Sequence, residues 1–316
     1  MQKKIKWIKF GIFAAISLAA FIIGIVGAAT FGVGYSDESV HTVFVESEDD
    51  LRAMGDSFYN NICYLENDIT VSELSVLADE RHPFVGVFDG QGHTVTLTGS
   101  AAVKSLFGYI GEGGVVRNLH IVVEEATLAN RATSATLALV NEGLIQNCRV
   151  TVKRMAVELR GHYGAVVGVN EGTVEHTFAE VSFVGTMSAT ERESSSKLVL
   201  AAGVAFNKGT VDTVIATVRY TDIDEADGNL VANTQSGIVN RGVGAVVGNN
   251  NDGTVKNAYA LTDAGVHLYD AHIAHVTVAS TNIDEVYSVV LLFDTLNFDD
   301  QIWVLRNREP LFIQGV

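Results

Sequence analysis

The sequence is poor in proline and cysteine, with two of each in 316 residues. So little proline excludes a Pro-rich extended stalk. Two cysteines, Cys63 and Cys148, are too few for a disulfide framework in a chain of this length. The chain is long enough for one large domain or two ordinary ones.

Positive charge is also scarce. The chain has 21 Lys+Arg against 37 Asp+Glu, and four of its basic residues, Lys3, Lys4, Lys6 and Lys9, lie at the N-terminus. A surface this acidic repels phosphate backbones, so nucleic acid is excluded as an expected partner.

Charge is absent altogether from residues 10–35. This stretch is long enough to cross about 30 Å of hydrocarbon as a helix. With lysines before it and acidic residues after it, the positive-inside tendency predicts a cytoplasmic basic tail (1–9) and a single-pass membrane anchor (10–35). A linker (36–44) and an extracellular domain (45–316) would follow. The alternative is a signal peptide cleaved near Val26-Gly27-Ala28.

The rest of the chain is organised around a repeated unit. Gly164-Ala-Val-Val-Gly168 and Asn170-Glu-Gly172 return as Gly244-Ala-Val-Val-Gly248 and Asn251-Asp-Gly253, with looser copies between and before them. The turn glycines Gly114, Gly143, Gly172, Gly209 and Gly253 are spaced by 29, 29, 37 and 44 residues. A fixed period predicts a stacked array. The structural turn residues are expected to be Asn141, Gly143, Asn170, Gly172, Asn207, Gly209, Asn251 and Gly253, with the Asn in a left-handed conformation.

Three alternate positions after each glycine stay apolar or small. They are Leu119/Ile121/Val123, Cys148/Val150/Val152, Thr177/Ala179/Val181, Val214/Ala216/Val218 and Ala258/Ala260/Thr262. Alternation in register predicts strands with one buried face, and hence inward ladders between rungs. The expected fold is all-β, a single-stranded parallel β-helix (solenoid). A C-terminal cap at about 291–316 is expected, with Trp303 closing the open end.

These motifs resemble a known family. Val167-Gly-Val-Asn170-Glu-Gly-Thr-Val174 and its copies are similar to the GLUG-type repeat of bacterial surface proteins. Phe88-Asp-Gly-Gln-Gly-His-Thr-Val95 and Tyr64-Leu-Glu-Asn-Asp-Ile69 resemble the units before those repeats. The resemblance implies a β-helix of the pectin-lyase-like type in an exported, adhesin-like protein. The chain departs from the family at Glu112, where the first repeat lacks the turn Asn. It departs again at His176 and Thr213, which hold the position that Asn118, Asn147 and Asn257 hold in the other repeats. Irregular corners are expected in the rungs of His176 and Thr213.

Several residues could suggest chemistry, and each has a structural interpretation that we favour. Cys148 occupies a ladder position and Cys63 alternates with its neighbours, so both are expected to be buried fillers. Asp89 and His93 lie in a Gly-rich turn, and His267, His272 and His275 lack metal-ligand spacing. Asp222, Asp224 and Asp227 are weak divalent-cation candidates in an otherwise solvated loop. No catalytic residue and no cofactor are predicted.

Two insertions are the better candidates for a functional surface. Residues 186–197 and 221–237 both follow the outward-alternating strand of a repeat, so they should emerge at one corner of the array. Binding-edge candidates are Glu191, Arg192, Glu193, Lys197, Asp222, Asp224, Glu225 and Asp227. The expected function is binding, adhesion or display of an extracellular glycan or protein. The alternatives are a carbohydrate-active β-helix enzyme and a structural spacer.

Overall fold

The fold is taken from a computed structural model of the chain. It describes residues 40–54, 59–128, 133–157, 161–185, 198–221, 242–262, 274–280, 298, 303–306 and 309–312. Residues 41–316 form one compact unit. No helix among the described residues is long and apolar enough to cross a membrane; the proposed anchor, 10–35, lies outside them. The expected linker 36–44 is too long by a few residues, because strand β1 already begins at Thr42.

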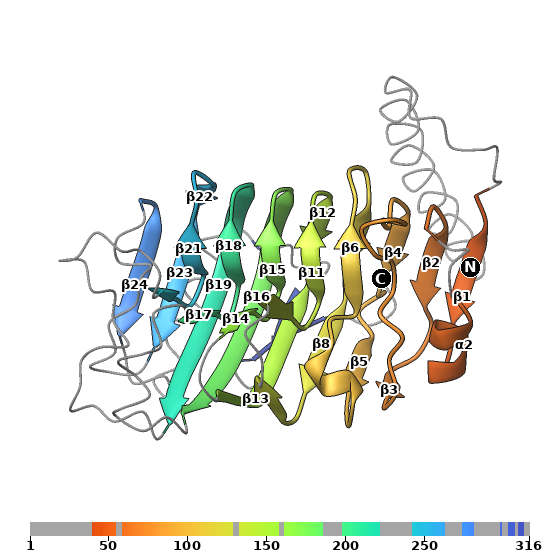
Figure 1. The fold of residues 1–316 in the computed structure, drawn as a ribbon, viewed down its shortest axis with the longest axis horizontal. Helices are drawn as coiled ribbons and strands as arrows, with labels where there is room; N and C mark the ends of the chain where they lie inside the picture. Colours follow the sequence, from red (N-terminus) through yellow and green to blue (C-terminus); the bar gives the residue numbers. More distant parts are fainter. Residues whose placement is uncertain are drawn as a thin grey trace, which may run out of the picture. The chain divides into compact units, whose positions relative to one another are not determined.

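The unit is a stack of parallel β-strands (Figure 1). Two walls are separate sheets. One contains β6 (Phe107–Ile110), β11 (Ala138–Asn141), β15 (Val167–Asn170), β18 (Val204–Asn207) and β21 (Val247–Asn250). The other contains β10 (Thr133–Ala135), β14 (Gly161–Gly164), β17 (Leu198–Ala201) and β20 (Gly242–Val243).

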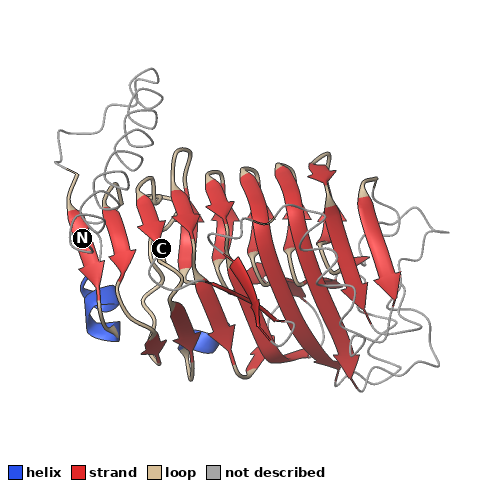
Figure 2. Ribbon diagram, turned by 180° about the vertical axis from the view of Figure 1, so that it is seen from behind, coloured by secondary structure: helices blue, strands red, loops and turns tan. Residues whose placement is uncertain are grey.

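A 15-stranded sheet forms the remaining walls (Figure 2). Its first part contains β1 (Thr42–Val45), β2 (Ile62–Leu65), β4 (Val87–Asp89), β7 (Val115–Arg117), β12 (Leu144–Gln146) and β22 (Thr254–Lys256). Its second part contains β3 (Ile69–Val71), β5 (Thr94–Leu97), β8 (His120–Val123), β9 (Ala126–Leu128), β13 (Arg149–Val157), β23 (Ala258–Thr262) and β24 (Val276–Ser280). Strands β16 (Thr173–Gly185) and β19 (Thr210–Thr221) run through both parts.

The predicted inward ladder is confirmed. Val150 pairs with Ile121 on one side and with Ala179 on the other, and Ala216 continues the row to Ala260. All fifteen ladder positions are at most 1% exposed. The prediction of an all-β fold with parallel, stacked strands therefore holds, since the buried face of each strand covers that of the next.

The Asn corners are stacked, but by a different geometry from the predicted one. Asn141 donates to Asn170 Oδ1 at 2.8 Å, and Asn170 donates to Asn207 Oδ1 at 2.9 Å. The ladder then passes from Asn207 to Asn250, at 2.8 Å, and not to Asn251. These residues end strands in ordinary extended conformation; none has a positive φ. Asn141, Asn170 and Asn207 are fully buried, so their amides form one hydrogen-bonded column.

Left-handed backbone occurs at a second corner instead. Asn118, Asn147, His176, Thr213 and Asn257 have φ of 53°, 50°, 47°, 54° and 47°. Irregular corners were expected at His176 and Thr213, but the backbone of these corners is regular. Both residues have the same positive φ as the Asn in the other repeats. Only the strand assignment differs, with β16 and β19 continuing through the corner.

Thr213→Asn is expected to stabilise the protein by about 1 kcal/mol, because a β-branched residue is strained at positive φ and Asn tolerates it. The side chain would keep a polar group near Asp212, which Thr213 and Asn257 both contact now. Urea unfolding measures the change. Thr210→Asn, on an ordinary extended strand, is the control; equal effects at the two positions would contradict the strain argument.

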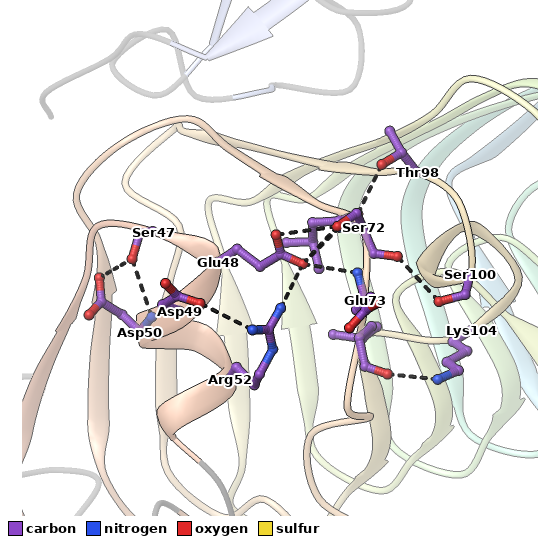
Figure 3. A network of polar contacts seen from close by, with 12 residues as sticks. Ser47, Glu48, Asp49, Asp50, Arg52, Ser72, Glu73, Thr98, Ser100 and Lys104 are labelled. Carbon is purple, nitrogen blue, oxygen red and sulfur yellow. Dashed lines mark hydrogen bonds and ion pairs between the residues drawn. The ribbon is translucent and has the colours of Figure 1, made fainter.

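A short helix follows the first strand, and three acidic residues occupy its first turn. Helix α2 (Glu48–Ala53) is N-capped by Ser47. The Glu48 carboxylate accepts hydrogen bonds from the backbone N–H groups of Ser72 and Glu73, both at 2.9 Å, and these bonds lower its pKa. Figure 3 shows this network continuing to Ser100 and to Lys104, which follows the 3-10 turn η2 (Ala101–Val103). The helix is thereby tied to the next two rungs.

The C-terminal residues that the structure describes pack against the side of the stack and not at its end. Strands β25 (Trp303–Arg306) and β26 (Glu309–Phe312) form an antiparallel hairpin. Trp303 packs edge-on against Phe298, and Phe298 packs against His176 on β16, an inner rung (Figure 1). The prediction that Trp303 plugs the open end was therefore wrong: Trp303 packs against Phe298 at the side of the stack.

An apolar patch on the outer face explains this docking. Phe178 and Ile215 alternate with the inward ladder and so point away from the core, yet they are only 4% and 0% exposed. They belong to the same two rungs whose corners depart from Asn. The C-terminal segment buries two aromatic side chains of its own, Phe298 and Trp303, at this part of the face. Burial of apolar surface is the driving force for the contact.

Candidate functional site

A groove lies on the outer face of β13, β16 and β19. It is lined by Thr151, Val152, Lys153, Glu180, Ser182 and Arg219. Thr151 pairs with Glu180, and Ser182 pairs with Arg219, so the outward side chains of three successive rungs meet here. The alternation that directs Val150, Ala179 and Ala216 inward is what directs Thr151, Glu180 and Ser182 outward. Val152, an inward ladder residue, borders the groove from below.

A β-bulge shapes one side of this groove. Val152 pairs with Val181 and Met155 with Phe183, so Lys153 and Arg154 together oppose the single residue Ser182. A bulge of this kind re-aims side chains and bends the strand. Lys153 forms an ion pair with Glu124 at 2.8 Å, and Arg154 forms one with Glu125. The small Ser182 is thus flanked by long charged side chains on both neighbouring strands.

The other side of the groove has an incompletely satisfied cation. Arg219 Nε lies 4.0 Å from Glu180 Oε1, which is an ion pair but too long for a hydrogen bond. The same Nε atom is buried from solvent and has no hydrogen-bond partner. The Arg219 side chain as a whole is 40% exposed, so its donor capacity beside Ser182 lies in the terminal guanidinium nitrogens and not in the enclosed Nε.

His120 lies beside the groove and is held neutral. Its ring nitrogens contact Thr94 Oγ1 at 3.4 Å and Thr151 Oγ1 at 3.2 Å. Burial, and secondarily the charge of Arg149, lower the pKa of His120 to about 3. A pKa this low leaves the imidazole uncharged at neutral pH and fixes Thr151 rather than supplying a proton donor.

The strands that anchor the two insertions end at one corner, close to the groove. Val184 pairs with Thr221, and Val199 pairs with Gly242, so residues 186–197 and 222–241 leave and return at adjacent positions on neighbouring rungs. The prediction that both emerge at the same corner is confirmed for the strands that anchor them. The candidate residues Glu191, Arg192, Glu193, Lys197, Asp222, Asp224, Glu225 and Asp227 lie outside the described residues.

The Asp89–His93 turn is held by structural contacts. Asp89 is 7% exposed and accepts from Arg117 Nε at 2.8 Å and from Asn118 Nδ2 at 3.0 Å. His93 Nδ1 lies 3.2 Å from Asp68 Oδ1. The positive φ of the turn falls at Gln91 and Gly92 rather than at Gly90. Gly90 is needed for a different reason, since a Cβ there would lie 2.5 Å from Asn118 O.

Metal-ligand clusters are absent from the part of the chain that the structure describes. His275 is exposed and has a φ of 66°. His267, His272, Asp222, Asp224 and Asp227 fall outside the described ranges.

Cys63 and Cys148 are fully buried, unbonded thiols, as predicted. Burial raises the pKa of each to about 12. Since the thiolate is the reactive form, we expect neither to react with iodoacetamide at pH 8 in the folded protein, and both to react in denaturant. Mass spectrometry counts the modified thiols. Rapid alkylation of the folded chain would contradict the buried ladder position of Cys148.

The chain matches no family model, no curated protein and no solved structure in the comparisons made. Lys153, Glu180, Ser182 and Arg219 were recognisable in the sequence only as the positions left free by the inward ladder. That they line one groove depends on the register and on the bulge, neither of which the sequence discloses.

Proposed function

We propose that this chain is a membrane-anchored, cell-surface β-solenoid that binds or displays an extracellular ligand, with no catalysis of its own. The observation that carries the proposal is that the strands leading into two insertions end at one corner of the stack, a few residues from a polar groove. Ser182 and Arg219 lie only a few residues before the points where the insertions leave. Insertions on one edge of a repeat array are a common place for binding.

The likeness of the repeats to GLUG-type units and the charge-free stretch 10–35 support export and anchoring. The acidic balance of the chain supports a soluble surface domain. The alternative, a carbohydrate-active enzyme, needs two carboxylates placed across a scissile bond. Among the described residues Glu180 is the one carboxylate that lines the groove, and the neighbouring Glu124 and Glu125 are ion-paired with Lys153 and Arg154. This favours binding over cleavage.

The test removes the insertions and keeps the stack. Residues 186–197 and 222–241 are replaced, singly and together, by a connector as short as residues 158–160, which join β13 to β14. The parent and trimmed chains are compared on glycan and protein arrays, with circular dichroism and thermal melting to verify folding. We expect binding to be lost while the melting transition remains. Unchanged binding would rule out this corner.

Topology is tested separately by protease treatment of intact cells expressing the chain. Release of fragments from residues 41–316 is expected if the unit is outside. Complete protection, with digestion only after lysis, would refute the surface location. Cleavage of a polysaccharide by the purified chain, abolished by Glu180→Gln, would establish the enzyme alternative.

A further inference from the structure

The groove has hydrogen-bond donors on Ser182 and Arg219 that no described residue fully uses. Ser182 is the only residue that β16 places between the bulge of β13 and Arg219 of β19. Strand spacing puts the backbones of Lys153 and Arg219 about 10 Å apart, two steps of the stack. Ser182 therefore forms the floor of the groove, with Lys153 on the neighbouring strand to one side and Arg219 on the neighbouring strand to the other.

Arg219 is the group that most clearly needs a partner. Its ion pair with Glu180 is long, at 4.0 Å, and although Nε itself is enclosed without a hydrogen bond, the side chain is 40% exposed. The two terminal nitrogens of such a guanidinium are suited to an end-on, two-pronged contact with a planar or tetrahedral oxyanion. The Ser182 hydroxyl adds a third donor, and Lys153, although paired with Glu124, is half-exposed and adds positive charge.

From this we infer that the groove is a seat for a carboxylate or sulfate group carried by an extended acidic saccharide. The oxyanion accepts from Arg219 and Ser182 and lies near Lys153. The inference rests on the proposed binding function and adds a ligand class to it. The residues around the seat favour a saccharide over an acidic peptide, because they are almost all polar and because Glu124, Glu125 and Glu180 supply acceptors for sugar hydroxyls.

The experiment uses the full chain and four probes: oligogalacturonate, a heparin oligosaccharide, a neutral glucose oligomer and polyglutamate. Binding is measured by calorimetry at two salt concentrations. We expect one of the two acidic saccharides to bind, more weakly at high salt, and the neutral oligomer to bind at least about tenfold more weakly. Preference for oligogalacturonate identifies a carboxylate, and preference for heparin identifies a sulfate.

Variants then locate the seat. Ser182→Ile fills the floor while suiting a strand, and Arg219→Gln removes the guanidinium; each is expected to weaken binding about tenfold or more. Ser182→Thr keeps the hydroxyl and is expected to retain most binding. Lys208→Gln is the matched control, because Lys208 is an ion-paired surface lysine at the turn with Glu171. Thermal melting verifies that each variant is folded.

Three results would overturn the seat. In the first, neither acidic saccharide binds, or both bind but Ser182→Ile and Arg219→Gln behave like Lys208→Gln. In the second, polyglutamate binds as well as the saccharides and with the same variant sensitivity, which would make the ligand an acidic peptide. In the third, a ligand found on the arrays is lost on trimming the insertions but not in Ser182→Ile; the proposed function would then stand without this seat.

Discussion

Replacing Asn170 with alanine is expected to destabilise the folded protein by about 3–5 kcal/mol, since it breaks a buried polar network in the middle. Asn170 accepts from Asn141 and donates to Asn207, and it also lies within 3.3 Å of the carbonyl oxygens of Gly172 and Thr210. Without it, Asn141 Nδ2 keeps only its weaker bond to Thr173 O, and Asn207 Oδ1 loses its partner, both inside a fully buried corner. Urea unfolding followed by circular dichroism gives the free energy.

Asn251→Ala is the matched control. Asn251 is exposed in the turn, although the sequence motif would make it the equivalent of Asn170. We expect a change of less than about 0.5 kcal/mol there. If Asn251→Ala destabilised the protein as much as Asn170→Ala, the ladder would have to pass through Asn251 and the register of β21 would be wrong. Asn250→Ala should fall between the two, because it ends the column.

Gly172→Ala is expected to have a comparably large effect, of at least about 3 kcal/mol, by overpacking. A Cβ on Gly172 would lie 2.2 Å from Gly143 O, and the atoms it meets are all backbone. The same contact recurs along the stack, with Gly143 against Gly114 O at 2.2 Å and Gly209 against Gly172 O at 2.1 Å. The turn glycines form a column in which each leaves room for the previous rung.

Gly113→Ala separates this steric effect from backbone strain. Gly113 has a φ of 87°, but a Cβ there would meet nothing within 4 Å. It should cost about 1–2 kcal/mol, the cost of a left-handed residue alone. Thermal melts of the two variants rank them directly. A Gly172→Ala protein as stable as Gly113→Ala would show that the rungs can separate at the turn.

The repeat copies explain which parts of the site were predictable. Between Gly164 and Gly172 the motif has its shortest form, and the copy ending at Gly253 contains one more residue. Counting back two residues from the turn glycine makes Asn251 the equivalent of Asn170. The register of β21 is instead set by its pairing with β18, which places Asn250 opposite Asn207 and so in the Asn ladder. The extra residue is absorbed in the turn, where Asp252 has a φ of 64°. Buried pairing outweighs turn geometry because its hydrogen bonds have no water to replace them.

Two apolar residues on the outward face, Phe178 and Ile215, indicate in the sequence that part of this face is covered. Phe178 and Ile215 stand where other rungs have His120, Arg149 and Tyr259, and their rungs also lack the corner Asn. Such a change on a solvent face indicates a covered surface. What covers it could not be read from the chain, because Phe298 is far away in sequence and its hairpin pairs only with itself among the described strands.

By itself the sequence determined the periodic part of this protein: which side chains enter the core, where the glycine turns lie, and at which corner the insertions leave. These follow from alternation and repeat spacing, which act locally and identically in every rung. Only the tertiary structure decided which Asn completes the ladder, where the C-terminal hairpin packs, and that Lys153, Ser182 and Arg219 share one groove. Those features depend on register, a bulge and contacts between distant segments, whose energies are set by burial in the assembled stack.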